Sequence, residues 1–212
     1  MTYRDSLAET LRQKIIDGEF MPGARLSESA LTSQLDVSRN TLREAYRVLA
    51  EQGLLVHVPH RGVSVAAPTV ADVVDIYRCR RNIEGTSLRQ AQPHHPGVSQ
   101  MMRALEQAEN HAAQHNWLGT GSANMAFHEA IVSLADSPRL LRMYRNVAAE
   151  LRLVFLAIDD PHTVHEPFVQ GNRGILSVFN EQGPVAAAEE LERYLLSSER
   201  NVLGAYSRAG KS

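Results

Sequence analysis

The sequence lacks the features that mark secreted and membrane proteins. Its 212 residues include one cysteine, so no internal disulfide can form, which is typical of the reducing cytosol. No apolar run approaches the roughly 18 residues that a membrane-spanning helix needs. The first ten residues do not show the charged-then-apolar pattern of a secretory signal. We therefore expect a soluble cytoplasmic protein without a membrane partner.

The sequence also lacks a strong excess of charge of either sign. The formal net charge is -2 and the pI is near 6.5, whereas nucleic-acid-binding domains are often strongly basic. Residues 1–66 contain eight basic and eight acidic residues. Any DNA binding by this part of the chain must therefore depend on where the charges lie, not on their sum.

The first third of the chain has the pattern of three helices and a β-hairpin. Apolar residues recur at helical spacing from Leu7 to Ile16. After a turn over residues 21–26, Ser27 can cap a short helix whose expected buried side chains are Ala30, Leu31 and Leu35. Ser38 can cap a third helix that runs to about Gln52. Alternating apolar residues on both sides of the turn "PHRG" then predict two paired strands.

The third predicted helix has one apolar face and one basic face. Leu42, Ala45 and Leu49 share one side, and the arginines at a spacing of four share the other: Arg39, Arg43 and Arg47. A solvated charged face is the ordinary explanation of such a pattern. In a winged helix-turn-helix, however, this helix enters the DNA major groove. Arginine can pair with guanine and asparagine with adenine, and both types stand at the start of this helix.

The hairpin turn adds a second group of candidate DNA contacts beside this helix. His60, Arg61 and Gly62 form the tip of the predicted wing, where an arginine can enter the minor groove. Ser38 and Thr41, in the first turn of the third helix, can donate to phosphate. The DNA-binding residues predicted from the pattern are Ser38, Arg39, Asn40, Thr41, Arg43, Arg47, His60, Arg61 and Gly62.

Three segments of this region resemble the DNA-binding domain of the GntR family of bacterial transcription regulators. They are "IIDGEFMPGARLSE", "VSRNTLREAYRVLAEQGL" and "RGVSV". The resemblance implies DNA contacts at the start of the third helix and at the wing tip, and it adds Ser29 to them. The family usually has Thr-Pro after "SR", where this chain has Asn40-Thr41, so its base preference is expected to differ.

Beyond Pro68 the pattern becomes wholly helical. Six amphipathic segments follow, and Gly119 to Gly121 are expected to separate the second segment from the third. We predict a mainly α protein: a winged helix-turn-helix domain over 1–68 and an all-α bundle of six to seven helices over 69–212. This part has no paired carboxylates, nucleophile elbow or phosphate loop, so an enzyme is not expected.

The helical part resembles the FCD domain of the FadR subfamily of GntR regulators, through "RCRRNIE" and "NMAFHEAIVSLADSPRL". Many FCD domains hold a divalent metal with one aspartate and three histidines. The corresponding positions here are Asn124, His128, Asn172 and Tyr194, and His128 alone is a good ligand. We therefore predict that the family metal site is degraded and that no cofactor is bound.

The same four residues, together with Arg80, are the predicted effector-binding residues. Arg80 can pair with a carboxylate, and the others are neutral hydrogen-bonding groups. Alternatively, His128 is a satisfied core histidine, and Arg80 forms an ion pair with Glu84 four residues on. The expected function is a homodimeric regulator that binds a palindromic operator under control of a small effector, expected to be a carboxylate. In the alternative function the bundle only dimerises and binds no effector.

Overall fold

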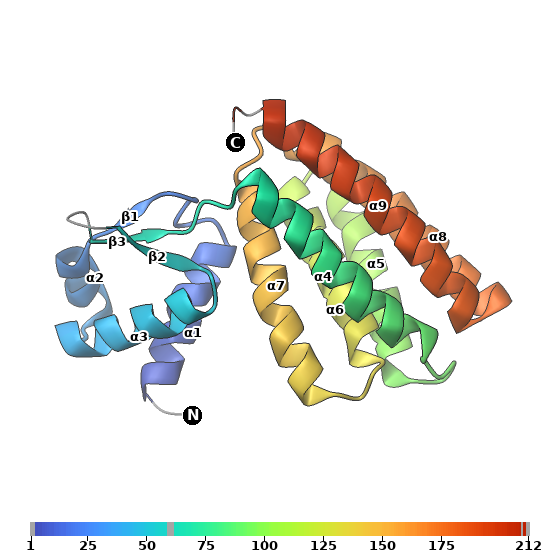
Figure 1. The fold of residues 1–212 in the computed structure, drawn as a ribbon, viewed down its shortest axis with the longest axis horizontal. Coiled ribbons are helices and arrows are strands. Elements are labelled where there is room, and N and C mark those ends of the chain that lie inside the picture. Colours follow the sequence, from blue (N-terminus) through green and yellow to red (C-terminus); the bar gives the residue numbers. More distant parts are fainter. Residues whose placement is uncertain (1–2, 59–61, 209, 211–212) are drawn as a thin grey trace. The chain divides into compact units, whose positions relative to one another are not determined.

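The computed structural model describes residues 3–58, 62–208 and 210, with the backbone alone for residues 3–5. These residues form two compact units. The first contains residues 1–68 together with 149–157, and the second contains residues 69–148 and 158–212. The helices and the small sheet of the first unit, and the long helices of the second, can be followed in Figure 1.

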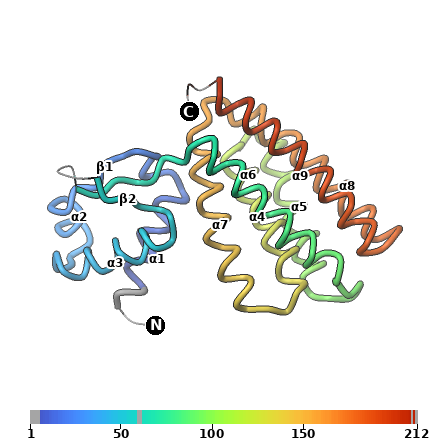
Figure 2. The backbone as a smooth tube through the Cα atoms, viewed as in Figure 1, coloured from blue at the N-terminus to red at the C-terminus, as the bar shows by residue number. Residues whose placement is uncertain are grey.

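Two of the helices of the first unit, α2 and α3, begin where the sequence supplies a capping side chain. Helix α1 spans Tyr3–Ile16, α2 spans Glu28–Leu35 and α3 spans Arg39–Glu51. Ser27 accepts a hydrogen bond from the backbone N–H of Ala30, and Ser38 accepts one from Thr41, so each cap satisfies an otherwise unpaired donor. Helices α2 and α3 can be followed in the backbone trace of Figure 2.

The sheet contains one more strand than the sequence pattern indicates. Strands β2 (Leu55–Val58) and β3 (Gly62–Val65) form the predicted antiparallel hairpin. Strand β1 (Arg25–Leu26) pairs with the other edge of β3, which gives the order β1-β3-β2. The expectation of a simple turn over residues 21–26 was incomplete, because a two-residue strand is too short to show alternation.

The core of the first unit lies between its helices and the sheet. Leu42, Ala45 and Leu49 of α3 are fully buried, as the apolar face of this helix predicts. In α2 the expectation for Ala30 was wrong: Leu31 is buried, whereas Ala30 is exposed. The segment 149–157, which includes the end of α7, supplies two further residues to this core, Ala149 and Leu153.

Six long helices follow in the described residues after Pro68, and all but the last part of α7 belong to the second unit. Thr69 and Asp72 form a capping box that starts the first of them. The glycines at 119 and 121 do not interrupt the chain as expected, because both lie inside one helix that Asn116 caps. The six are α4 (Val70–Arg89), α5 (Pro96–Ala113), α6 (Trp117–Ser133), α7 (Pro138–Leu156), α8 (Pro161–Gln182) and α9 (Pro184–Arg208).

All strands found in the described part of the chain belong to the first unit. This arrangement confirms the predicted fold class, a winged helix-turn-helix followed by a helical bundle. Within the ranges that the structure describes, no helix is both long and apolar enough to cross a membrane.

Candidate functional site

The basic face of α3 is exposed to solvent. Its apolar face is buried, and Arg39, Arg43 and Arg47 on the opposite face are all exposed. Asn40 at the start of the helix is exposed as well. The helix therefore presents these predicted contact residues to solvent, on the face opposite its buried side.

The three arginines of this face differ in how they are paired. The Nε and Nη2 atoms of Arg43 donate to the carboxylate of Glu28 on α2, over 3.1–3.3 Å. This hydrogen bond raises the pKa of Arg43. Arg47 is paired with Glu44 one turn earlier, whereas Arg39 forms no ion pair with any residue that the structure describes. The pattern of α3 alone did not reveal Glu28, because this residue comes from another helix.

The remaining predicted contacts lie at the ends of α2, α3 and β3. The hydroxyls of Ser38 and Thr41 are 2.8 Å apart, and that of Ser29 is 3.2 Å from the hydroxyl of Ser27. Gly62 is exposed, with a φ of +87° that favours glycine. The predicted contacts His60 and Arg61 lie outside the described residues.

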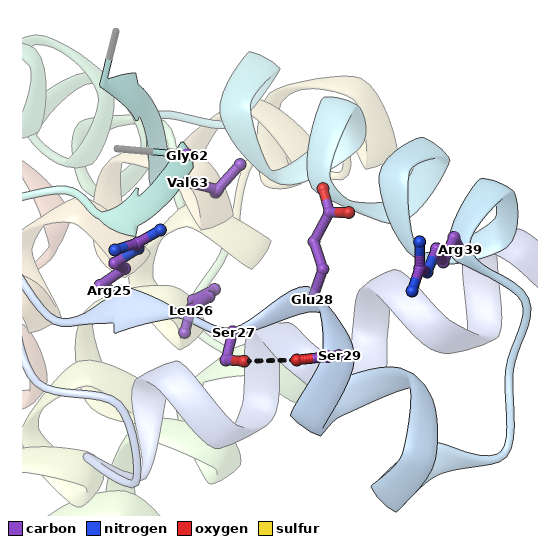
Figure 3. Close-up of a pocket in the computed structure, with 8 residues that line it drawn as sticks. All are labelled: Arg25, Leu26, Ser27, Glu28, Ser29, Arg39, Gly62 and Val63. Carbon is purple, nitrogen blue, oxygen red and sulfur yellow. Dashed lines mark hydrogen bonds between the residues drawn. The ribbon is translucent and has the colours of Figure 1, made fainter. Parts of the chain in front are cut away.

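A pocket of about 600 Å³ lies where α2, α3 and the sheet meet. Figure 3 shows Arg25 and Arg39 on opposite sides of it, with Ser27 and Ser29 between them. Glu28 and Gly62 also line the pocket. The sequence analysis did not include Arg25 among the contacts. The signal that could have indicated it is its place directly before Leu26, since this short strand has an exposed residue followed by a buried one.

The second unit contains a buried polar cluster centred on Glu84. Its carboxylate accepts hydrogen bonds from Arg80 Nε at 2.7 Å and Tyr144 Oη at 2.8 Å on one oxygen. The other oxygen lies 2.7 Å from His128 Nδ1. Glu84 is fully buried, and Arg80 is 1% exposed. Arg80 thus forms the ion pair with Glu84 that was considered as its alternative role. His128 is likewise a core histidine with a hydrogen-bond partner, because it is bound to the same carboxylate.

The charges of this cluster follow from its burial. Burial by itself would raise the pKa of Glu84, but the charge of Arg80 and the hydrogen bonds from His128 and Arg80 lower it to about 2. Burial lowers the pKa of His128, although Glu84 opposes this shift. At neutral pH we therefore assign an ionised Glu84 and a neutral His128 that donates through Nδ1, which leaves Nε2 as an acceptor.

The other predicted effector-binding residues continue this cluster. Tyr194 Oη lies 3.3 Å from both His128 Nε2 and Asn124 Oδ1. Asn172 Nδ2 donates to the same Asn124 oxygen at 2.8 Å. Two buried atoms, Arg80 Nη2 and Asn172 Oδ1, have no hydrogen-bond partner in the described part of the chain. The structure thus brings together all five predicted residues, and it adds Glu84 and Tyr144, which sequence reasoning did not include in the site.

The donor set of this cluster does not fit the metal of related domains. Amide oxygens at positions 124 and 172 are weak ligands for zinc or nickel, and burial raises the pKa of the Tyr194 phenol. His128 donates its Nδ1 proton to Glu84, so its Nε2 is the one imidazole nitrogen that these four residues can offer to a metal. Among the residues that the structure describes, no group of three or more His, Cys, Asp or Glu side chains is placed to hold a metal ion.

A surface pocket of about 290 Å³ lies beside Tyr194, between α8 and α9. Phe168, Arg193 and Asn201 line it together with Gly171. A Cβ atom at Gly171 would lie 2.4 Å from Cδ2 of Tyr194, so the glycine makes room for the ring. Tyr194 thus belongs both to this pocket and to the buried cluster.

Comparison with known proteins identifies both parts of the chain. Residues 3–65 match the bacterial regulatory proteins of the gntR family, and residues 75–197 match the FCD domain. The chain belongs to the GntR family. The crystal structure of a GntR transcriptional regulator from Rhodococcus sp. RHA1 is similar, with 40% identity, a TM-score of 0.92 and coverage of 97% of this chain and 100% of that one.

Curated relatives of this GntR-family protein are also regulators. The HTH-type transcriptional regulator YdhC of Bacillus subtilis (strain 168) is 31% identical over 144 residues, which are 65% of this chain and 62% of YdhC. The HTH-type transcriptional repressor GlaR of Escherichia coli (strain K12) is 28% identical over 173 residues, 74% of this chain and 79% of GlaR. The resemblance to GntR and FCD domains is confirmed, and the relatives are regulators of transcription and not enzymes.

Proposed function

We propose that this GntR-family protein is a homodimeric transcription regulator that binds a palindromic DNA operator through the exposed face of α3. The observation that carries this proposal is the row of exposed arginines on a helix whose other face is buried. A two-fold symmetric dimer would present two such helices, and the operator would mirror that symmetry. We place the boundary between the DNA-binding domain and the FCD domain near Pro68.

The roles within α3 follow from the pairing of its arginines. Arg39 is free to contact DNA as it stands, whereas Arg43 is held by Glu28 on both nitrogens that face it. A carboxylate on one side of the guanidinium fixes its plane and leaves other N–H groups for a base edge. We therefore assign Arg43 to base reading and Arg47, which lies a turn further on, to phosphate or solvent. Asn40 at the helix start is where we expect the operator to differ from those of relatives.

We also propose that the buried cluster of the FCD domain is the effector site. Buried polar atoms are nearly always hydrogen-bonded, so an unpaired donor and an unpaired acceptor in one cluster indicate a missing polar molecule. Arg80 Nη2 offers a donor and Asn172 Oδ1 an acceptor. A small hydroxy acid has both complementary groups: a carboxylate oxygen for the arginine and a hydroxyl for the amide.

The charge of Glu84 makes the effector class testable. Since Glu84 already neutralises Arg80, a second carboxylate gains the hydrogen bond at Nη2 but adds a buried negative charge. Thermal-shift measurements with small hydroxy acids, each matched to the alcohol without the carboxylate, compare the two contributions directly. We expect a rise in Tm with the acid and none with its alcohol, and the opposite order would contradict a carboxylate effector.

The path from effector to DNA is proposed to involve helix α7. Tyr144 of α7 donates to Glu84 in the cluster, and Ala149 and Leu153 of the same helix belong to the core of the first unit. A ligand that changes the hydrogen bonds of Glu84 therefore has a continuous helix through which to act. If the bundle only dimerises, operator affinity will not respond to any compound that raises Tm.

A further inference from the structure

Two arginines and one glutamate line the pocket shown in Figure 3, and one of these arginines, Arg25, does not belong to the basic face of α3. Arg25 enters it from β1 and Arg39 from the first turn of α3, and both side chains are exposed. Neither forms an ion pair with a residue in the described ranges. The acidic lining residue, Glu28, is already bound by Arg43. The pocket therefore carries two uncompensated guanidinium groups.

The pocket also offers neutral hydrogen-bond donors and free access. The hydroxyls of Ser27 and Ser29 lie along it and interact only loosely with each other, at 3.2 Å. At Gly62 a Cβ atom would meet no heavy atom within 4 Å, so the backbone there borders open space. Arginine forks and hydroxyls at one concave site are the groups that proteins use for phosphate oxygens.

We propose that Arg25 and Arg39 each bind the phosphate backbone of the DNA duplex at this pocket. The proposal rests on DNA binding by this face of the protein, and it adds Arg25 as a contact and assigns Arg39 to phosphate. A concave pocket shared by two elements fits a phosphate that projects from the backbone, whereas a base edge in a groove floor is read from the recognition helix itself. These phosphate contacts would set the register of α3 on the duplex.

The first measurement is the salt dependence of binding to a mixed-sequence 24-base-pair duplex, by fluorescence anisotropy in sodium chloride. Each phosphate contact contributes close to one unit to the slope of log affinity against log salt. Arg25→Ala should weaken binding by the same factor for every duplex, whatever its base sequence. It should also reduce the slope of log affinity against log salt by about 1. Arg25→Lys, which keeps the charge, should retain the slope. Arg200→Ala removes an exposed arginine of α9 and should change neither quantity.

Arg39→Ala should repeat the effect of Arg25→Ala. An unchanged slope and affinity in Arg25→Ala would overturn the proposal, and so would a loss confined to one sequence, since that indicates base reading. Circular dichroism melts of each variant separate these results from a folding defect. Failure of the wild-type protein to bind any duplex would instead contradict the proposed DNA-binding function itself.

A further arm separates DNA phosphate from free anion as the occupant. Inorganic phosphate is compared with chloride at equal ionic strength in thermal-shift measurements on wild type and Arg25→Ala. We expect at most a weak effect, because a free ion lacks the neighbouring contacts of a duplex. A large rise in Tm that Arg25→Ala removes, with an unchanged DNA slope, would identify a free-anion site and overturn the proposal.

Discussion

The basic face of α3 in the first unit and the buried polar cluster of the second unit use arginine in opposite ways. In the first unit the arginines of α3 are exposed, and the ion pairs of Arg43 and Arg47 lie at the surface. In the second unit Arg80 is 1% exposed and bound to a fully buried carboxylate. Exposed charges contribute little to stability and attract a partner from a distance. Buried charges must be satisfied within the fold, and they make any change in their surroundings costly.

The largest expected effect is the loss of the buried carboxylate. Glu84→Ala leaves the Arg80 charge buried without its partner and should lower the free energy of unfolding by about 3–5 kcal/mol. The matched change in the first unit, Glu28→Ala, removes a surface pair and should cost about 0–1 kcal/mol. Urea unfolding measures both values, and equal losses would end the contrast between the two units.

The next effect concerns base reading. Arg43→Ala should cost about 1–3 kcal/mol of specific operator binding if Arg43 contacts a base. Arg47→Ala should instead weaken specific and non-specific binding alike. Footprinting titrations on the operator and on unrelated DNA separate the two, and undiminished discrimination in Arg43→Ala would refute its role.

The buried cluster should also make the free energy of unfolding depend on pH. Burial holds the pKa of His128 below its ordinary value of 6.5, so as pH falls the unfolded state takes up this proton before the folded state does. The free energy of unfolding should therefore decrease between pH 7.5 and 5, by at most about 1.4 kcal/mol per pH unit for one proton. The corresponding loss for Glu84 begins only below its ordinary pKa of 4.5 and extends to about 2.

His128→Asn serves as the comparison for this pH dependence, because it replaces the titrating imidazole with a neutral amide that can still donate a hydrogen bond. The variant should show a shallower decrease than the wild type between pH 7.5 and 5. Identical slopes would mean that His128 does not contribute to the pH dependence.

The smallest expected effect is that of metal removal. Since the donor set around His128 does not fit a divalent ion, a chelator should leave the Tm unchanged, and elemental analysis should find no stoichiometric metal. One tightly held zinc or nickel ion per chain would show that amide and phenol groups do serve as ligands here.

Much of the local structure could be predicted from the residues. Ser27 and Ser38 stand directly before apolar periodic segments, and both cap helices that begin where the pattern places them. Strand β1 could not be predicted in this way, because its two residues form a strand only through pairing with β3. The glycines of α6 misled the prediction, since packing and the Asn116 cap outweigh their low helix propensity.

In the candidate sites too, features set by spacing within one helix could be predicted, whereas contacts between distant segments could not. The arginine face of α3 is a property of spacing within one helix, so the sequence predicted its exposure. The partners of those arginines were not predictable, because Glu28 lies 15 residues before Arg43 and on another helix. The same holds for Tyr144, which reaches Glu84 from 60 residues away.

What the sequence determined by itself is therefore the order of the helices, the buried face of α3 and the family, because these depend on spacing along the chain. The tertiary structure alone decided which charges are paired and which are free. Among the described residues it gives Arg25 and Arg39 no ion-pair partner at one pocket, while it encloses Arg80 with Glu84, His128 and Tyr144. The physical reason is that pairing and burial depend on side chains brought together from distant segments, and no local pattern records those distances.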